Sequence, residues 1–189
     1  MEYFDIVDEK GQPTGEIVER SKAHAEGIMH RTSHVWLVRE KNGNIEILLQ
    51  ERCDTKDSFP GQYDISSAGH IPAGVGFAQS AIRELKEELG VDAAEDDLIS
   101  CGDRIVTWDE EFYGVPFHDR QYSRVFALWC ELDEDQFTLQ EEEVSAVLWM
   151  DMDKLIDAVN ENTIPHCIFP EELLMVKNTI QKLIKKAIL

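Results

Sequence analysis

The segment GHIPAGVGFAQSAIRELKEELGV, residues 69–91, restricts what this chain can fold into more than any other stretch. It joins a glycine-rich turn to a run whose apolar residues recur at the three-to-four spacing of a buried helical face. These residues are Ala78, Ala81, Ile82, Leu85 and Leu89. Gly90 follows, and glycine is a residue with which helices commonly end. The pattern predicts a helix over 77–90 that packs on a core through one face.

The other face of this predicted helix concentrates negative charge. Glu84, Glu87 and Glu88 are spaced i, i+3 and i+4, so the three carboxylates share one face. A solvated acidic face is one interpretation, since the whole chain is acidic. The preceding glycines can also bring backbone close to a ligand. Because Mg²⁺ prefers carboxylate and carbonyl oxygens, the combination indicates a cation site beside the turn.

These residues resemble the signature of the Nudix hydrolases. That signature runs Gly, five residues, Glu, seven residues, Arg-Glu, an aliphatic residue, any residue, Glu-Glu, any residue, Gly and an aliphatic residue. Gly69 and the stretch 83–91 match it in register, whereas Val75 stands where the signature has its first glutamate. In the family that glutamate is mainly structural. The resemblance therefore implies that Val75 alters the bracing of the loop more than the chemistry.

The resemblance also implies a role for each matching residue. Glu84 and Glu88 would be ligands of Mg²⁺ or Mn²⁺, and Glu87 would be a ligand or would orient the water. The backbone carbonyl of Gly69 would complete the coordination. Arg83 would be an ion-pair partner that orients a helix glutamate. Cations held in this way neutralise a diphosphate, activate a water and stabilise the leaving oxygen.

A general base often comes from a later loop in this family. Glu141, Glu142 and Glu143 precede a predicted strand that ends near Trp149, and Glu143 has the most suitable spacing to that tryptophan. A solvated loop charge is an equally good interpretation of Glu143.

Two cations flank the loop before the signature. Arg52 and Lys56 could pair with the terminal phosphates of a substrate, as a fork or as a point charge. The alternative is that both are ordinary surface charges.

Three further stretches resemble the isopentenyl-diphosphate-isomerase-like branch: DIVDEKGQPTG, HRTSHVWL and QERCDTKDSFPGQYDISSAGH. True isomerases of that branch bind a metal through several histidines, and His24, His30 and His70 lie near the matching positions. A hydrogen-bonding structural role is the alternative for each histidine. His70 follows the first glycine of the signature, so we expect it at the site as a substrate-binding residue.

Isomerase chemistry needs a proton donor and a proton acceptor on either side of a double bond. The branch uses a cysteine just before the Gly-His pair and a glutamate on a later strand. Here the first position is Ala68 and the second aligns with Gln121. Alanine carries no proton and glutamine is a poor acid or base. The resemblance therefore favours a hydrolase built on an isomerase-like frame.

The remaining segments predict an α/β fold. Strands flank a Gly/Pro turn within 5–18, and strands 33–40 and 45–52 flank an Asn42-Gly43 hairpin turn. Strands are also predicted at 123–132 and 144–150, with helices at 152–162 and 170–189. The resemblance implies a Nudix-type α/β/α sandwich with a mixed sheet and additional C-terminal helices. We expect residues 1–189 to form a single Nudix domain, with a core at about 30–160, an N-terminal β-hairpin and a C-terminal helix.

Charge and cysteine usage limit the partners and the compartment. The net charge is −20, from 18 basic and 38 acidic residues, and it disfavours nucleic-acid polymers and anionic membranes as partners. The N-terminus lacks the pattern of a signal peptide, and no apolar run approaches membrane-spanning length. The four cysteines lack a CxxC spacing, which is typical of reduced thiols in a cytoplasmic protein. We expect a cytoplasmic enzyme with a small-molecule diphosphate substrate.

The C-terminal helix packs on the domain or forms a homodimer seam.

The functional hypothesis is a metal-dependent hydrolase of a diphosphate linkage. Its substrate would be a nucleoside diphosphate derivative or a small organic diphosphate. One alternative is an isopentenyl-diphosphate isomerase-like enzyme. Another, motivated by Val75, is a degenerate Nudix domain that binds nucleotide without turnover.

Overall fold

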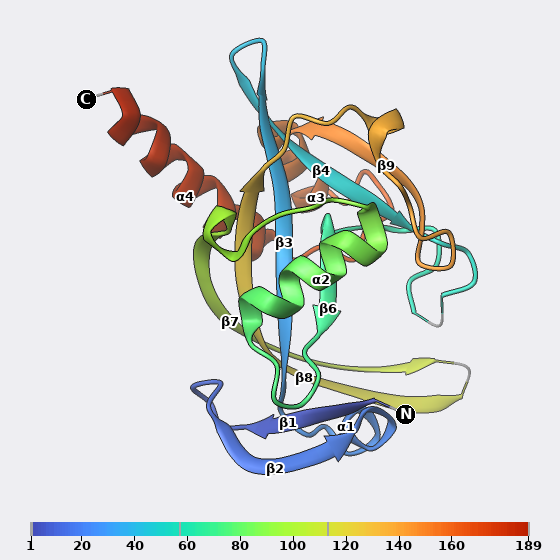
Figure 1. The fold of residues 1–189 in the computed structure, drawn as a ribbon. Helices are drawn as coiled ribbons and strands as arrows, with labels where there is room; N and C mark the ends of the chain where they lie inside the picture. Colours follow the sequence, from blue (N-terminus) through green and yellow to red (C-terminus); the bar gives the residue numbers. More distant parts are fainter. Residues whose placement is uncertain (1, 57, 113, 189) are drawn as a thin grey trace.

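A mixed β-sheet forms the centre of the protein (Figure 1). The computed structural model describes residues 2–56, 58–112 and 114–188. Within these ranges the main sheet has seven strands in the order β5-β4-β3-β8-β7, with β6 paired to β3 and β9 paired to β4. The strands are β3 (His30–Lys41), β4 (Asn44–Arg52), β5 (Tyr63–Asp64), β6 (Ser67–His70), β7 (Ile99–Phe112), β8 (Val115–Trp129) and β9 (Val144–Asp151). Strands β3 and β8 are parallel, and the other pairs in this sheet are antiparallel.

Strand β3 is the axis of the sheet. Its first half pairs with β6, its second half with β4, and most of its length with β8. Its first ten residues are all buried, as expected for a strand covered on both faces. The polar residues at its start are therefore held inside the protein, next to the end of β6.

Helices cover both faces of the sheet, α2 (Phe77–Leu89) on one and α3 (Met152–Asn160) with α4 (Pro170–Ile188) on the other (Figure 1). On the α2 side, Leu85 and Leu89 are fully buried in a cluster with Val35 and Leu37. On the other side, α3 and α4 pack on alternate residues of β3 that include Trp36. This arrangement confirms the predicted α/β/α sandwich with a mixed sheet and C-terminal helices.

Backbone φ angles confirm the predicted hairpin turn and the predicted end of the helix. Asn42 and Gly43 both have positive φ, 54° and 81°, as the hairpin turn between β3 and β4 requires. Gly90 ends α2 in the left-handed conformation with φ 71°.

Two elements were not predicted. Residues 99–112 form β7, and β8 begins at Val115, well before the predicted strand at 123. The two strands make a long antiparallel hairpin. Residues 20–26, which had no assigned type, form the short helix α1 (Arg20–Glu26), ended by Gly27 with φ 64°.

The N-terminal hairpin and the first half of α4 pack on the core, whereas the C-terminal part of α4 projects from it (Figure 1). The N-terminal hairpin of β1 (Tyr3–Val7) and β2 (Pro13–Glu19) buries Phe4 completely. Three residues of α4 are fully buried, namely Leu173, Val176 and Ile180. This packing supports the expectation of a single domain, which stays a prediction, as does the homodimer. Among the described helices, none combines the length and apolarity needed to span a bilayer.

Candidate active site

One cleft of about 520 Å³ gathers the residues that the sequence singled out. It opens between α2, the end of β6 and the loops that follow β4 and precede β9. The predicted site residues that line it are Gly69, His70, Arg83, Glu84, Glu87, Glu88, Arg52, Lys56 and Glu143. The structure therefore brings every predicted site residue to the same cleft, while their chemical roles remain predictions.

The carboxylate of Glu84 rests against the backbone of Gly69. A Cβ atom added at Gly69 would clash with the Glu84 carboxylate. Position 69 therefore has to be glycine for strand β6 and helix α2 to approach this closely. Burial raises the pKa of Glu84, and the neighbouring Arg83 opposes that shift.

Glu88 lies deeper, with a relative exposure of 7%. Its Oε2 atom has no hydrogen-bond partner within the described residues. Burial raises its pKa to about 8, and the nearby Glu84 carboxylate adds to the shift. A buried carboxylate oxygen without a donor is an unfavourable state that a bound cation would relieve. The residues around Gly69 thus fit a divalent metal.

Arg83 bridges two of the helix glutamates. Its Nη2 lies 2.5 Å from Glu84 Oε1, and its Nη1 lies 2.6 Å from Glu87 Oε2. Glu87 is half exposed, so it faces the open side of the cleft. The ion pair predicted for Arg83 is therefore present and involves both carboxylates.

The turn containing Val75 is held by residues outside the signature. Arg31 Nη2 donates to the backbone oxygen of Val75 at 3.0 Å and to Asp5 Oδ2 at 2.6 Å. The same Asp5 oxygen accepts from the backbone N–H of Gly74 at 2.9 Å. A carboxylate from β1 thus braces this turn, although Val75 supplies none.

The guanidinium of Arg52 is committed to its own loop. It donates to Asp64 Oδ2 at 2.9 Å, to the Ser58 carbonyl at 3.0 Å and to Ser58 Oγ at 3.1 Å. These bonds organise the loop at residues 54–64. They favour a structural role for Arg52 over the predicted phosphate contact.

Lys56 and Glu143 contact one another across the cleft mouth. Burial is the main cause that lowers the pKa of Lys56. Glu141 and Glu142 are exposed, and neither lines the cleft. Of the three adjacent glutamates, Glu143 therefore has the position that a general base needs.

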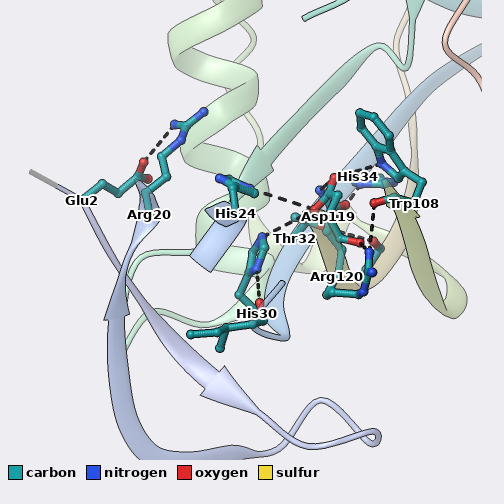
Figure 2. A network of polar contacts seen from close by, with 12 residues as sticks. Glu2, Arg20, His24, His30, Thr32, His34, Trp108, Asp119 and Arg120 are labelled. Carbon is teal, nitrogen blue, oxygen red and sulfur yellow. Dashed lines mark hydrogen bonds and ion pairs between the residues drawn. The ribbon is translucent and has the colours of Figure 1, made fainter. Parts of the chain in front are cut away.

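Three histidines converge next to the cleft, and Figure 2 shows two of them, His24 and His30, near Asp119, which lines it. His24 comes from α1, His30 from β3 and His70 from β6, and their ligand atoms lie within 4.8 Å of one another. Asp119 of β8 joins them, because its Oδ1 lies 4.0 Å from His24 Nε2 and 3.9 Å from His30 Nε2.

The chemistry of these donors also fits a cation. His30 Nδ1 donates to the Ile28 carbonyl at 2.8 Å, which leaves the Nε2 lone pair facing the cluster. Burial lowers the pKa of all three imidazoles, that of His24 to about 4, so they are neutral and able to coordinate. Their Nε2 atoms and Asp119 Oδ1 are buried without hydrogen-bond partners in the described part of the chain.

Sequence reasoning missed a third group. Thr32 and His34, on the same face of β3, line the cleft, and His34 Nδ1 lies 3.0 Å from both oxygens of Glu172 on α4. Both residues belong to the HRTSHVWL stretch, but the resemblance gave a role to neither of them. Ala68 and Gln121, which lack the isomerase proton relay, line the same cleft.

The NUDIX domain model matches residues 29–168 of the chain. Nudix hydrolase 3 of Arabidopsis thaliana is 41% identical over 152 residues, which cover 79% of this chain and 19% of that protein. This chain thus spans about a fifth of the length of that relative. An uncharacterized Nudix hydrolase of Clostridium acetobutylicum is 34% identical over 154 residues, covering 82% of this chain and 72% of that one. A solved Deinococcus radiodurans structure shares the fold, with a TM-score of 0.66, 17% identity and coverage of 93% and 98%.

Proposed function

Since this chain belongs to the Nudix hydrolase family, we propose that it is a metal-dependent hydrolase of a diphosphate linkage. The substrate is a nucleoside diphosphate derivative or a small organic diphosphate. The observation that carries the proposal is the placement of Glu84 against Gly69, together with the buried, unpartnered oxygen of Glu88 in the same cleft.

Each residue in this part of the cleft has a proposed task. Glu84, Glu88 and the Gly69 carbonyl hold Mg²⁺ or Mn²⁺, and Glu87 is a further ligand or orients the water. A cation bound there would neutralise the diphosphate and make the water more acidic. Arg83 fixes the carboxylates of Glu84 and Glu87.

The opposite wall supplies a base and a positive charge. Glu143 accepts the proton of the attacking water. Lys56, which contacts Glu143, supplies the positive charge that pairs with a phosphate oxygen of the substrate.

The direct test is phosphate release with and without Mg²⁺ from nucleoside di- and triphosphates, nucleotide sugars, dinucleotides and isopentenyl diphosphate. Glu88→Gln should lower metal-dependent turnover by at least about 100-fold, because a metal ligand is lost. Glu95→Gln, at an exposed glutamate that does not line the cleft, is the matched control. Equal turnover of both variants would contradict the assignment.

The histidine cluster supports a second cation. We propose that His24, His30 and His70 hold it together with Asp119, as histidines do in the isomerases that this chain resembles. Metal content of the purified protein, measured by plasma emission spectroscopy, should fall by one equivalent in His30→Gln. It should be unchanged in His118→Gln, whose exposed imidazole pairs with Asp109. Equal metal content in the two variants would refute this second site.

Two alternative functions remain as outcomes of the same panel. Isomer formation from isopentenyl diphosphate would favour the isomerase, despite Ala68 and Gln121. Metal-supported binding of a nucleotide without any turnover would favour a degenerate binding domain.

A further inference from the structure

Glu172 is a buried carboxylate at the start of α4, with a relative exposure of 1%. Three side chains from the sheet donate to it. Trp36 Nε1 and Arg104 Nη1 each lie 2.8 Å from one of its oxygens, and His34 Nδ1 lies 3.0 Å from both. No residue of the predicted active site contacts Glu172 in these bonds, so the group has no part in the function proposed so far.

The carboxylate fixes the hydrogen positions of His34. Burial favours the neutral form of Glu172 by raising its pKa, whereas the Arg104 guanidinium and the Trp36 N–H favour the ionised form by lowering it. An ionised carboxylate only accepts hydrogen bonds, so His34 Nδ1 carries the hydrogen. In the neutral imidazole, Nε2 is then an acceptor.

The imidazole of His34, which carries this acceptor nitrogen, lies at the wall of the cleft. His34 lines the cleft opposite Ala68, its partner in the β3–β6 pairing. Its neighbour Thr32 is 3.3 Å from Nε2 and donates its hydroxyl hydrogen over a shorter distance, 2.7 Å, to Ser123 Oγ.

The side-chain amide of Gln121, which also lines the cleft, already has hydrogen-bond partners. Gln121 Nε2 donates to Asp119 Oδ2 at 2.7 Å, and its Oε1 faces the Thr32 hydroxyl at 3.3 Å. These contacts use both the N–H and the oxygen of the Gln121 amide. His34 Nε2 thus has a long contact of 3.3 Å with the Thr32 hydroxyl, whose hydrogen goes to Ser123, and a ligand that donates a hydrogen bond can complete this acceptor.

We propose that His34 is a specificity-determining residue of the cleft and that Glu172 is its positioning residue. The proposal rests on the diphosphate hydrolase function above. His34 Nε2 accepts a hydrogen bond from a hydroxyl or amine on the organic part of the substrate. A hydrocarbon group at this place would bury Nε2 without a donor, which disfavours isoprenoid diphosphates by roughly 10- to 100-fold in kcat/KM.

The test compares two substrates in three proteins. The ratio of kcat/KM for a nucleoside diphosphate sugar to that for isopentenyl diphosphate is measured in the wild type, His34→Phe and His34→Gln. Both variants lose the bond to Glu172, but the glutamine amide offers an acceptor near the position of Nε2. The ratio should fall at least about 10-fold in His34→Phe. It should stay within about 3-fold of the wild type in His34→Gln. An equal loss on both substrates in His34→Phe would overturn the proposal.

A separate variant, Glu172→Gln, tests the positioning role of Glu172. Glu172→Gln places an amide that can donate to Nδ1, which would move the imidazole hydrogen to Nε2 and remove the acceptor. The substrate ratio should then fall as in His34→Phe, whereas Glu171→Gln, at the exposed neighbour, should leave it unchanged. An unchanged ratio in a folded Glu172→Gln protein would overturn the role of Glu172.

Binding measurements distinguish a failure of the His34 proposal from a failure of the proposed hydrolase function. If no diphosphate releases phosphate, the hydrolase assignment fails, and calorimetry with the same two ligands still measures selectivity. A ratio of dissociation constants that drops in His34→Phe and is retained in His34→Gln would support His34 without turnover. An unchanged ratio in both would overturn the proposal.

Discussion

Arg31 and Asp5 form an ion pair of 2.6 Å that joins the strand beneath the cleft to the N-terminal hairpin. Both side chains are largely buried, and both also bond to the backbone of the turn before α2. A residue outside the signature therefore supplies the bracing that Val75 does not provide. This relationship connects the position of α2 to the first residues of the chain.

Replacement of Asp5 by alanine should destabilise the protein. Arg31 would keep a buried charge without its partner, and we expect a loss of about 3 kcal/mol in the free energy of unfolding. Urea denaturation measures this loss. Glu9→Ala, in the exposed turn of the same hairpin, is the control and should change stability by less than about 0.5 kcal/mol. Similar midpoints for both variants would show that the hairpin does not brace the turn.

Replacement of Gly69 by alanine should displace Glu84. The new Cβ would occupy the space of the Glu84 carboxylate, so metal-dependent turnover should fall by about 10-fold or more. Gly76→Ala is the matched control, because nothing lies within 4 Å of a Cβ at that position. Turnover assays over a range of Mg²⁺ concentrations would detect a weakened metal affinity. Comparable kinetics for the two alanine variants would contradict the close packing of Gly69 on Glu84.

In the metal-free protein, Glu88 should make a contribution to stability that is lost as the pH rises from about 4.5 to about 8. In this window the folded state retains the Glu88 proton, whose pKa is raised to about 8, while the unfolded chain loses it near 4.5. At this group the folded state binds more protons, so its contribution to the slope of unfolding free energy against pH is negative.

Glu88→Gln should remove that contribution. Its stabilisation relative to the wild type should grow by roughly 1 kcal/mol per pH unit between pH 5 and pH 7.5. Urea unfolding in the presence of a chelator measures it, with Glu95→Gln as the control. The same gain at both pH values would exclude Glu88 as the source.

Glu143 should be distinguishable from its neighbours by kinetics. Glu143→Gln should lower kcat by about 100-fold, as loss of a general base does, with a smaller effect on KM. Glu142→Gln should have no such effect, since its side chain is exposed and away from the cleft. Equal kcat values for the two variants would leave Lys56 without a catalytic partner and would assign the base elsewhere.

The elements that sequence predicted well are those specified by nearby residues. Helix α2 has its apolar spacing and its terminal Gly90 within one segment, and the β3–β4 turn needs only Asn42-Gly43. Strand β7 was missed because its exposed residues include the charged Asp103, Asp109 and Glu111 and its extended form comes from pairing with β8. Helix α1 was missed because it has only seven residues, of which two are buried, too few to show an apolar periodicity.

In the candidate site too, features specified by nearby residues could be predicted, whereas contacts between distant segments could not. The acidic face of α2 could be predicted because its glutamates belong to one helix. The contact between Lys56 and Glu143 joins two loops distant in sequence, and His34 and Glu172 are 138 residues apart. No periodicity within a segment reports such pairs, since they depend on how the sheet and α4 come together.

Glu172 follows the residues that donate to it by 68 residues or more, and this order has a consequence for biosynthesis. A ribosome releases the amino end first, so His34, Trp36 and Arg104 emerge well before the acceptor that they share. Until α4 docks, these donors remain without Glu172, and the inner wall of the cleft is unfinished. Prematurely terminated polypeptides would therefore carry the acidic helix but not the completed cleft.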